Sequence, residues 1–389
     1  MKVGRFKAKN KNLWIGVMIS GLAILAGIGY YAYTGYYASI STPPQPQVIK
    51  IGHLGPLTGF AANYGEQERQ AIDLAVEEIN AKGGINGKRL EVIHEDDQLD
   101  PTLATNAINK LITVDKVVAV IGELSSTVTL AVAPIAEKNK VVLMVHAANS
   151  NKLSGAGEYI FRIYPTNTDE GQALVELASS LGSKNASILY VNNDYGTDLE
   201  SVVKKDFAEN GGTISISEGY NPDETDFRTQ LTKVKEKNPT VVFLLGYPKD
   251  MAMILRQAKE IGLRPLFLAD DTFNNPQIVD WSGNASEGVV FVTPSNGDAE
   301  RWQELSQKIE NKYGDNATFI TAMAYDATNL LAASMESSGA TSDEIKTGLT
   351  QLKDYPGVTG NITFDKNHDV ETRLFSIMIV KGGKFEDYK

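Results

Sequence analysis

The chain has 389 residues and contains no cysteine, an absence that removes several kinds of chemistry at once. Disulfide bonds, thiolate metal sites, cysteine nucleophiles and cysteine-linked lipids are all excluded. Histidine is also scarce, and the four histidines show no metal-ligand spacing such as HExxH. A nucleophile-elbow GxSxG and a phosphate-binding P-loop are missing as well. The sequence therefore predicts no metal site and no cofactor, and it favours a protein that is not an enzyme.

An excess of positive charge is missing too. The formal net charge is −11, although five basic residues already lie before residue 13. An acidic chain repels the phosphate backbone, so nucleic acid is not expected as a partner. Hydrophobic residues make up 42% and charged residues 22%, which is ordinary for globular proteins. A chain of this length exceeds the comfortable size of one hydrophobic core, so we expect two lobes.

One long apolar run lies near the start of the chain. Leu13 to Tyr33 is nearly uncharged and long enough to cross a bilayer, for which about 20 residues suffice. Basic residues precede the run and tyrosines cluster at its far end, as the positive-inside rule and the aromatic belt describe. The pattern predicts a cytoplasmic tail over 1–12, a transmembrane anchor over 13–37 and a proline-rich spacer over 38–47. A cleaved signal peptide is the alternative, but no small-x-small cleavage site follows the run.

From Val48 onward, apolar strand patterns alternate with amphipathic helix patterns. Such alternation is typical of doubly wound α/β layers. Strands are predicted at about 48–54, 90–94, 117–121, 141–145, 187–191, 240–245, 265–269, 288–292, 361–364 and 375–380. Helices are predicted at about 66–81, 102–113, 126–139, 168–181, 196–209, 226–237, 248–262, 299–313, 317–337 and 342–352.

Ligands of doubly wound sheets bind at the loops that leave the carboxyl ends of the strands. The loop after the first predicted strand is glycine-rich and ends with Tyr64. The loop after the third carries Ser125 and Ser126 directly before a helix, where hydroxyls cap helices and backbone N–H groups favour a carboxylate. The loop after the fourth ends with Ser150. Two neighbouring hydroxyl-bearing loops favour a subsite for an anion.

The second half of the chain places aromatic and acidic residues after its strands. Tyr195 and Tyr247 follow two of them, and Asp270 and Asp271 follow a third. Adjacent residues on an extended segment point in opposite directions, so we expect only one of the two aspartates to face the ligand. Paired acids also permit a catalytic interpretation, because one carboxylate raises the pKa of the other. An acidic subsite in one lobe and hydroxyls in the other together fit a zwitterion.

Long motifs then point to a family. The segments IKIGHLGPLTGFAANYG, AVEEINAKGGINGKRLEVIHEDDQLDP, AVIGELSST, YVNNDYGTD and LRQAKEIGL resemble the leucine/isoleucine/valine-binding family of transporter solute receptors, from about Lys50 to the C-terminus. The resemblance implies a type I periplasmic-binding fold, in which two lobes are joined by a hinge of three crossovers near 165, 290 and 353. It thus assigns 48–165 and 291–353 to lobe 1, and 166–290 and 354–389 to lobe 2.

The resemblance also implies the roles of individual residues. Ser126 and Ser150 bind an α-carboxylate, Asp271 pairs with the ammonium, and the three tyrosines close over the ligand. Two departures matter, since Asp271 stands where branched-chain binders have Glu, and Asn149 replaces a small apolar residue. Both put the branched-chain side chain in doubt. The complete set of ligand-binding residues implied in this way is Tyr64, Leu124, Ser125, Ser126, Ala148, Asn149, Ser150, Tyr195, Tyr247 and Asp271.

Three hypotheses follow for the function. In the first, the protein is an extracytoplasmic receptor that delivers an amino acid or analogue to an ABC permease. In the second, the same domain reports its ligand to a signalling partner. The third is an enzyme that uses Asp270 and Asp271. An amide or an aromatic acid is the alternative ligand, because relatives of this family bind such compounds.

Overall fold

The computed structural model describes residues 23–33, 48–222, 224–295, 297–371 and 375–389. Residues 23–33 are helical and belong to a unit separate from Val48–Lys389. Within the described parts of the chain, no helix has both the length and the apolar composition to cross a bilayer. The predicted tail over 1–12, the spacer over 38–47 and most of the predicted anchor over 13–37 lie outside the described residues.

Lobe 1 is built on a parallel sheet of five strands in the order β2-β1-β3-β4-β5. Every residue of β3 and β4 is buried, as expected for apolar strands that are covered by helices on both faces. The strands are β1 Val48–Gly55, β2 Arg89–Asp96, β3 Ala119–Ile121, β4 Val142–Val145 and β5 Ile160–Arg162.

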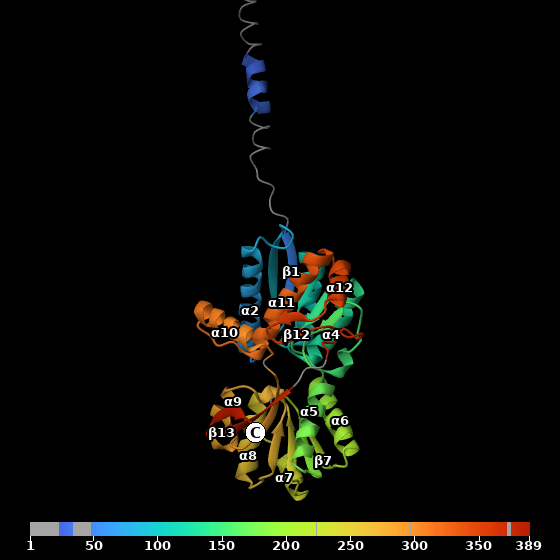
Figure 1. The fold of residues 1–389 in the computed structure, drawn as a ribbon, viewed down its shortest axis with the longest axis vertical. Coiled ribbons are helices and arrows are strands. Elements are labelled where there is room, and N and C mark those ends of the chain that lie inside the picture. The colour runs from blue at the N-terminus through green and yellow to red at the C-terminus, as the bar shows by residue number, and fades with distance from the viewer. Residues whose placement is uncertain (1–22, 34–47, 223, 296, 372–374) are drawn as a thin grey trace, which may run out of the picture. The chain divides into compact units, whose positions relative to one another are not determined.

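The helices of lobe 1 cover both faces of this sheet (Figure 1). One face packs against α2 Ala62–Ala81, α11 Phe319–Ser338 and α12 Ser342–Gln351. The other face packs against α3 Pro101–Lys110 and α4 Ser126–Asn139. The remaining elements are α10 Ala299–Tyr313, the short helical turns Leu111–Asp115 and Asn151–Leu153, and the hairpin of β11 Tyr355–Gly357 and β12 Gly360–Ile362.

Lobe 2 is built on a mixed sheet of seven strands in the order β14-β13-β10-β9-β8-β6-β7. Strands β6 to β10 are parallel, and β13 and β14 add an antiparallel edge. The strands are β6 Asn185–Val191, β7 Thr213–Tyr220, β8 Val241–Leu245, β9 Leu266–Ala269, β10 Val290–Pro294, β13 Phe375–Lys381 and β14 Lys384–Asp387. The helices are α5 Asn167–Ser180, α6 Asp194–Glu209, α7 Arg228–Glu236, α8 Pro248–Glu260 and α9 Gln277–Ser282, with short turns at Asp271–Phe273 and Gly283–Ala285.

The lobe boundaries differ from the predicted division at two crossovers. Strand β10 runs to Pro294 within the lobe 2 sheet, so the second crossover follows Pro294 rather than residue 290. Ile362 and Val370 pack in the lobe 1 core, so the third crossover lies between Val370 and Phe375 rather than near 353. The reason is that β11 and β12 form a separate hairpin whose apolar side chains cover lobe 1. The first crossover lies between β5 and α5, near the predicted residue 165.

Polar residues at helix starts fix the loops that face the other lobe. Ser125 caps α4, Asn193 caps α6, and Thr166 forms a capping box at the start of α5. Each cap satisfies backbone N–H groups that the first helical turn leaves without partners. The same caps hold Ser126 and Tyr195 within the first turns of their helices.

Candidate functional site

Two loops of lobe 1 meet through Ser126 and Ser150. The backbone N–H of Ser150 donates a hydrogen bond of 3.2 Å to the Oγ atom of Ser126, and both residues are buried. Ser125 has the ordinary role of a helix cap, because its Oγ atom accepts a hydrogen bond from the backbone N–H of Val128. The structure thus brings together the two serines whose loops the sequence assigned to one anion subsite.

Glu123 lies in the same wall and was not singled out from the sequence. Its Oε2 atom accepts a hydrogen bond of 2.7 Å from the backbone N–H of Ser125, and its side chain is buried. Burial raises the pKa of Glu123 well above its usual range, and the charge of Asp97 raises it further. Burial likewise raises the pKa of Asp97 to about 6. Lobe 1 therefore presents an acid pair directly beside the predicted carboxylate subsite.

Asn149 connects lobe 1 to the first helix after the crossover. Its Nδ2 atom donates a hydrogen bond of 3.1 Å to Oε2 of Glu170, and its carbonyl accepts one of 2.7 Å from the backbone N–H of Asn167. Its neighbour Ala148 is buried in the core on one face of the lobe 1 sheet, and the partly exposed Leu124 packs against the core on the other face. Asn149, which stands where relatives have a small apolar residue, thus has Glu170 as a hydrogen-bond partner. The sequence did not predict this contact.

Glu170 and the two aspartates form a compact group of three buried carboxylates. One oxygen atom from each of Glu170, Asp270 and Asp271 lies within 4.8 Å of the others. Oε1 of Glu170 accepts a hydrogen bond of 2.7 Å from the backbone N–H of Asp271, and the hydroxyl of Tyr164 donates one of 2.7 Å to Oδ2 of Asp271. We refer to Glu170, Asp270 and Asp271 as the acid cluster.

The backbone at the two aspartates differs from the extended segment that the sequence predicted. The short helical turn of Asp271–Phe273 begins at the second aspartate, so the alternation of an extended segment does not continue through the pair. Oδ2 of Asp270 accepts a hydrogen bond of 2.5 Å from the backbone N–H of Gly246, and Oδ1 accepts one from Thr272. Asp270 thereby ties the loops after β8 and β9 together.

Crowding and burial shift the protonation of these acids. Burial raises the pKa of Glu170 well above its usual range, and the charges of Asp271 and Asp270 raise it further. Burial also raises the pKa of Asp270 to about 8 and the pKa of Asp271 to about 6. Like charges at this separation disfavour full ionisation. The acid cluster therefore holds protons at neutral pH.

Aromatic residues of lobe 2 lie beside the acid cluster. The rings of Tyr195 and Tyr247 are stacked with centroids 6.1 Å apart and an interplanar angle of 30°. Nδ2 of Asn193 donates a hydrogen bond of 2.9 Å to the hydroxyl of Tyr247. Burial raises the pKa of Tyr247 to about 12, so its hydroxyl stays protonated. The structure thus brings the two predicted aromatic residues together.

Tyr64 reaches the other lobe directly. Its hydroxyl accepts a hydrogen bond of 2.7 Å from Nδ2 of Asn275, which lies in lobe 2. Lys152 of lobe 1 forms a second link through an ion pair of 2.7 Å with Asp194 at the start of α6. The loops that carry the predicted residues therefore face one another, and we call their surroundings the interlobe site. It comprises Tyr64, Glu123, Ser126, Asn149, Ser150, Glu170, Tyr195, Tyr247, Asp270, Asp271 and Asn275.

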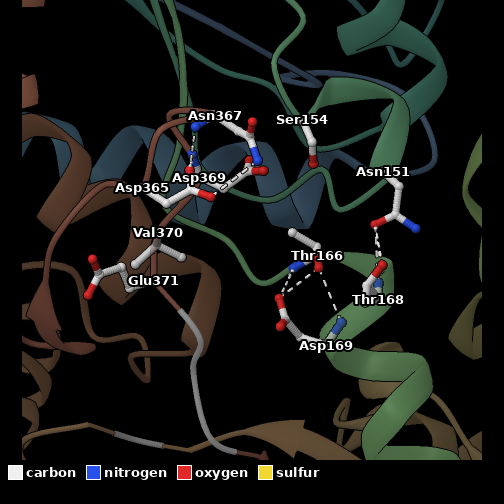
Figure 2. Close-up of a pocket in the computed structure, with 10 residues that line it drawn as sticks. All are labelled: Asn151, Ser154, Thr166, Thr168, Asp169, Asp365, Asn367, Asp369, Val370 and Glu371. Atoms are coloured by element: carbon white, nitrogen blue, oxygen red, sulfur yellow. Dashed lines mark hydrogen bonds between the residues drawn. The ribbon is translucent and has the colours of Figure 1, made fainter.

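A polar cavity of about 570 Å³ lies at the crossovers, outside the interlobe site (Figure 2). Thr166 and Asp169 line it from the start of α5, and Asp365 and Asp369 line it from the segment before the third crossover. Asp369 forms an ion pair of 2.7 Å with the buried Arg162. None of the predicted ligand-binding residues lines this cavity. The cavity therefore belongs to the hinge, because its lining residues lie next to the first and third crossovers.

A network of histidines and acids lies next to the interlobe site in lobe 1. Glu68 lies within ion-pair distance of His53, at 3.3 Å, and of His146, at 3.0 Å. His53 contacts His94 at 2.9 Å between the Nδ1 atoms. Burial lowers the pKa of His53, which therefore stays neutral at neutral pH. Glu68 lies on α2, one helical turn after Tyr64, and His146 lies in the loop after β4. The network therefore links α2 to that loop.

Two α/β lobes, a three-segment hinge and facing loops with polar and aromatic side chains define a two-lobed ligand-binding protein. A sequence model of the family described as "Periplasmic binding protein" matches residues 48–384. The chain therefore belongs to the periplasmic binding protein family. This assignment confirms the predicted α/β fold and the resemblance from which it was drawn.

Relatives with known ligands are similar over most of their length. The leucine-, isoleucine-, valine-, threonine- and alanine-binding protein of Pseudomonas aeruginosa is 29% identical, over 85% of this chain and 89% of its own. The Leu/Ile/Val-binding protein of Escherichia coli is 27% identical, over 92% of this chain and 96% of its own.

Solved structures extend the similarity to the fold. A leucine-binding protein of Thermotoga maritima superimposes with a TM-score of 0.82 at 28% identity, over 88% of this chain and 98% of its own. The branched-chain amino acid transporter substrate-binding protein of Streptococcus pneumoniae, in complex with isoleucine, gives a TM-score of 0.80 at 29% identity, over 87% of this chain and 98% of its own.

Proposed function

We propose that this protein is the extracytoplasmic receptor of an ABC importer and binds an amino acid or a close analogue between its lobes. One observation carries the proposal. Glu170 is hydrogen-bonded both to Asn149, the neighbour of Ser150 in lobe 1, and to Asp271 in lobe 2. The serine pair and the acid cluster therefore occupy one site. Hydroxyls on one side and carboxylates on the other are complementary to a zwitterion.

Each side of the site has a distinct role in this proposal. The hydroxyl of Ser126 and the free N–H groups of the first turn of α4 receive the ligand carboxylate, because a helix N-terminus favours negative charge. Ser150 positions Ser126 and completes the wall with Leu124, Ser125, Ala148 and Asn149. Asp271 receives the ammonium. Tyr64, Tyr195 and Tyr247 cover the ligand, and the lobes close because only the closed form contacts it from both sides.

The names of the relatives support an amino-acid ligand and a transport partner. Two curated relatives are named for leucine, isoleucine and valine, and a solved structure of a transporter substrate-binding protein contains isoleucine. The departures at Asn149 and Asp271 distinguish this site from a branched-chain site. We therefore propose that this chain binds the head group of an amino acid, and we do not extend the branched-chain side chain of the relatives' ligands to it.

We further propose that residues 13–37 anchor the protein in the membrane with residues 1–12 in the cytoplasm. The uncharged run from Leu13 to Tyr33, the preceding basic residues and the following tyrosines support the anchor. A membrane-anchored receptor stays near a permease in the same membrane. Carbonate extraction of membranes tests the anchor, because an anchored chain stays in the membrane pellet and a cleaved chain is released.

A ligand screen tests the binding proposal. Thermal unfolding of the full chain is measured with each amino acid and with simple amides, and stabilising compounds are titrated calorimetrically. A ligand at about 100 times its dissociation constant stabilises the fold by about 2.7 kcal/mol. Asp271→Asn should weaken binding by about tenfold to a hundredfold, as loss of a charged hydrogen bond predicts.

Asp280→Asn is the matched control, because Asp280 lies exposed on α9. It removes the same charge and should leave the affinity unchanged. If no amino acid or amide binds the native chain, the binding proposal is wrong. If Asp271→Asn binds as tightly as the native chain, the ammonium assignment is wrong.

A further inference from the structure

We propose that the ligand carries net positive charge, as an amino acid with a cationic side chain does, and that the acid cluster binds its cationic groups. This inference rests on the proposed function and narrows it to one class of ligand. It starts from the charges that face the interlobe site from both lobes. A zwitterion brings equal positive and negative charge, so one carboxylate suffices to balance its ammonium. The site contains more acids than that.

The acids lie on both sides of the site. On the lobe 2 side, the carboxylates of Glu170, Asp270 and Asp271 lie within 4.8 Å of one another. On the lobe 1 side, the buried Glu123 lies two residues before Ser125 and interacts electrostatically with Tyr247 of the other lobe. Its buried carboxyl group is hydrogen-bonded to that of Asp97, so two acids lie together on this side as well.

Basic side chains do not compensate these acids. Among the residues that the structure describes, no lysine, arginine or histidine forms an ion pair with Glu123 or with the acid cluster. The buried Arg162 is engaged elsewhere, because it binds Asp369, the carbonyl of Ser150 and the hydroxyl of Ser154. These acids are therefore balanced by bound protons or by a cation that the ligand supplies.

Two tyrosines lie against the acid cluster. The buried hydroxyl of Tyr195 is hydrogen-bonded to Asp270 and lowers the pKa of that carboxyl group. Tyr195 stacks with Tyr247, and aromatic rings attract cations through their faces. The tyrosines and the acids thus favour the same kind of group.

The protonation of the acid cluster agrees with this inference. Burial and mutual repulsion raise the pKa values of Glu170 and Asp270, so the cluster holds protons at neutral pH. Tyr164 and Tyr195 also face the cluster, and burial raises their pKa values well above the ordinary range, so both contribute neutral hydroxyls. A cationic ligand can replace the protons and allow the carboxylates to ionise.

Isosteric ligand pairs test the inference on the native full chain. L-Arginine is compared with L-citrulline, and L-lysine with L-norleucine, by isothermal titration calorimetry. In each pair only one member has a cationic side chain. We expect the cationic member of at least one pair to bind about tenfold tighter or more, as a charged hydrogen bond predicts. Equal or weaker binding of the cationic member in both pairs overturns the inference, as does binding of leucine by a chain that binds none of the four.

Variants assign the preference to the acid cluster. Glu170→Gln should reduce the affinity ratio between the cationic and the neutral member, because it removes a charge with little change in shape. Glu236→Gln is the control, since Glu236 is exposed on α7, and it should keep the native ratio. A native ratio in Glu170→Gln, with an unchanged thermal unfolding curve, contradicts the role of Glu170. Failure of every amino acid to bind the native chain refutes the proposed function itself, which separates the two outcomes.

Discussion

Oε1 of Glu170 accepts a hydrogen bond of 2.7 Å from the backbone N–H of Asp271, although 101 positions separate the two residues in the sequence. The other carboxylate oxygen of Glu170 accepts a hydrogen bond from Asn149. One side chain at the hinge therefore holds together a loop of lobe 1 and a loop of lobe 2. Substitutions that remove hydrogen bonds or ion pairs within and between the lobes should therefore change the stability or the ligand affinity of the protein.

Ser126→Ala should destabilise the fold by about 1–3 kcal/mol, because the buried N–H of Ser150 loses the oxygen that accepts its hydrogen bond. Urea unfolding measures the change. Ser201→Ala is the control, since Ser201 is exposed on α6, and it should stay within about 0.5 kcal/mol of the native value. An equal effect of both substitutions would show that Ser126 has no special structural role.

Tyr64→Phe should weaken ligand binding, because the hydrogen bond from Asn275 to the Tyr64 hydroxyl joins the two lobes in the arrangement described here. The loss should be about 0.5–1.5 kcal/mol of binding free energy, the usual range for one neutral hydrogen bond. Asn275→Ala and the double variant complete a thermodynamic cycle. A coupling energy near zero between the two positions would mean that the hydrogen bond is not formed in the ligand-bound protein.

Asp369→Asn should destabilise the protein by about 3–5 kcal/mol, because it leaves the charge of the buried Arg162 without compensation. Arg162 ends β5 before the first crossover, and Asp369 lies before the third, so the pair joins two hinge segments. Glu209→Gln in the exposed Lys205–Glu209 pair is the control and should cost less than about 1 kcal/mol. A similarly small loss in Asp369→Asn would refute this role for the hinge pair.

The ligand-free protein should lose stability as the pH rises from about 6.5 to about 9. The pKa of Asp270 is raised from 3.8 to about 8 in the folded state, and the pKa of Glu170 is also raised. In this window the folded state holds protons that the unfolded chain has lost, so unfolding releases them and becomes easier at higher pH. The window lies above the range in which neutral His53 adds a pH dependence of opposite sign.

Urea unfolding at several pH values measures this dependence. Glu170→Gln should flatten the slope, and Glu236→Gln should leave it unchanged. A stability that is constant or rises over the window would show that the acid cluster is ionised in the empty protein.

Much of the fold and part of the site were predictable because they depend on local patterns. Buried strands such as β8 are continuous apolar runs, and the hydroxyl-bearing residues at Ser125 and Ser126 identify the start of α4. Parallel strands place their carboxyl ends at one edge of a sheet. For that reason the sequence could predict that the loops of Ser126 and Ser150 are neighbours.

The features that escaped prediction depend on contacts between distant segments. Glu170 reads as an ordinary helix acid, and only the hinge brings it to Asp271. The third crossover was misplaced because the strand predicted over 361–364 packs on lobe 1 through Ile362 and Phe364, whereas β13 joins the lobe 2 sheet. Edge strand β7 alternates Ile214 and Ile216 with serines, a period-two pattern that could have been recognised.

The most direct test of the account is calorimetric titration of the purified full chain with the twenty common amino acids at neutral pH. The account predicts saturable one-to-one binding of at least one amino acid, with a dissociation constant that Asp271→Asn raises by about tenfold or more. It predicts the same dissociation constant for the native chain and for Asp280→Asn. Absence of binding by all twenty, or native affinity in Asp271→Asn, would contradict it.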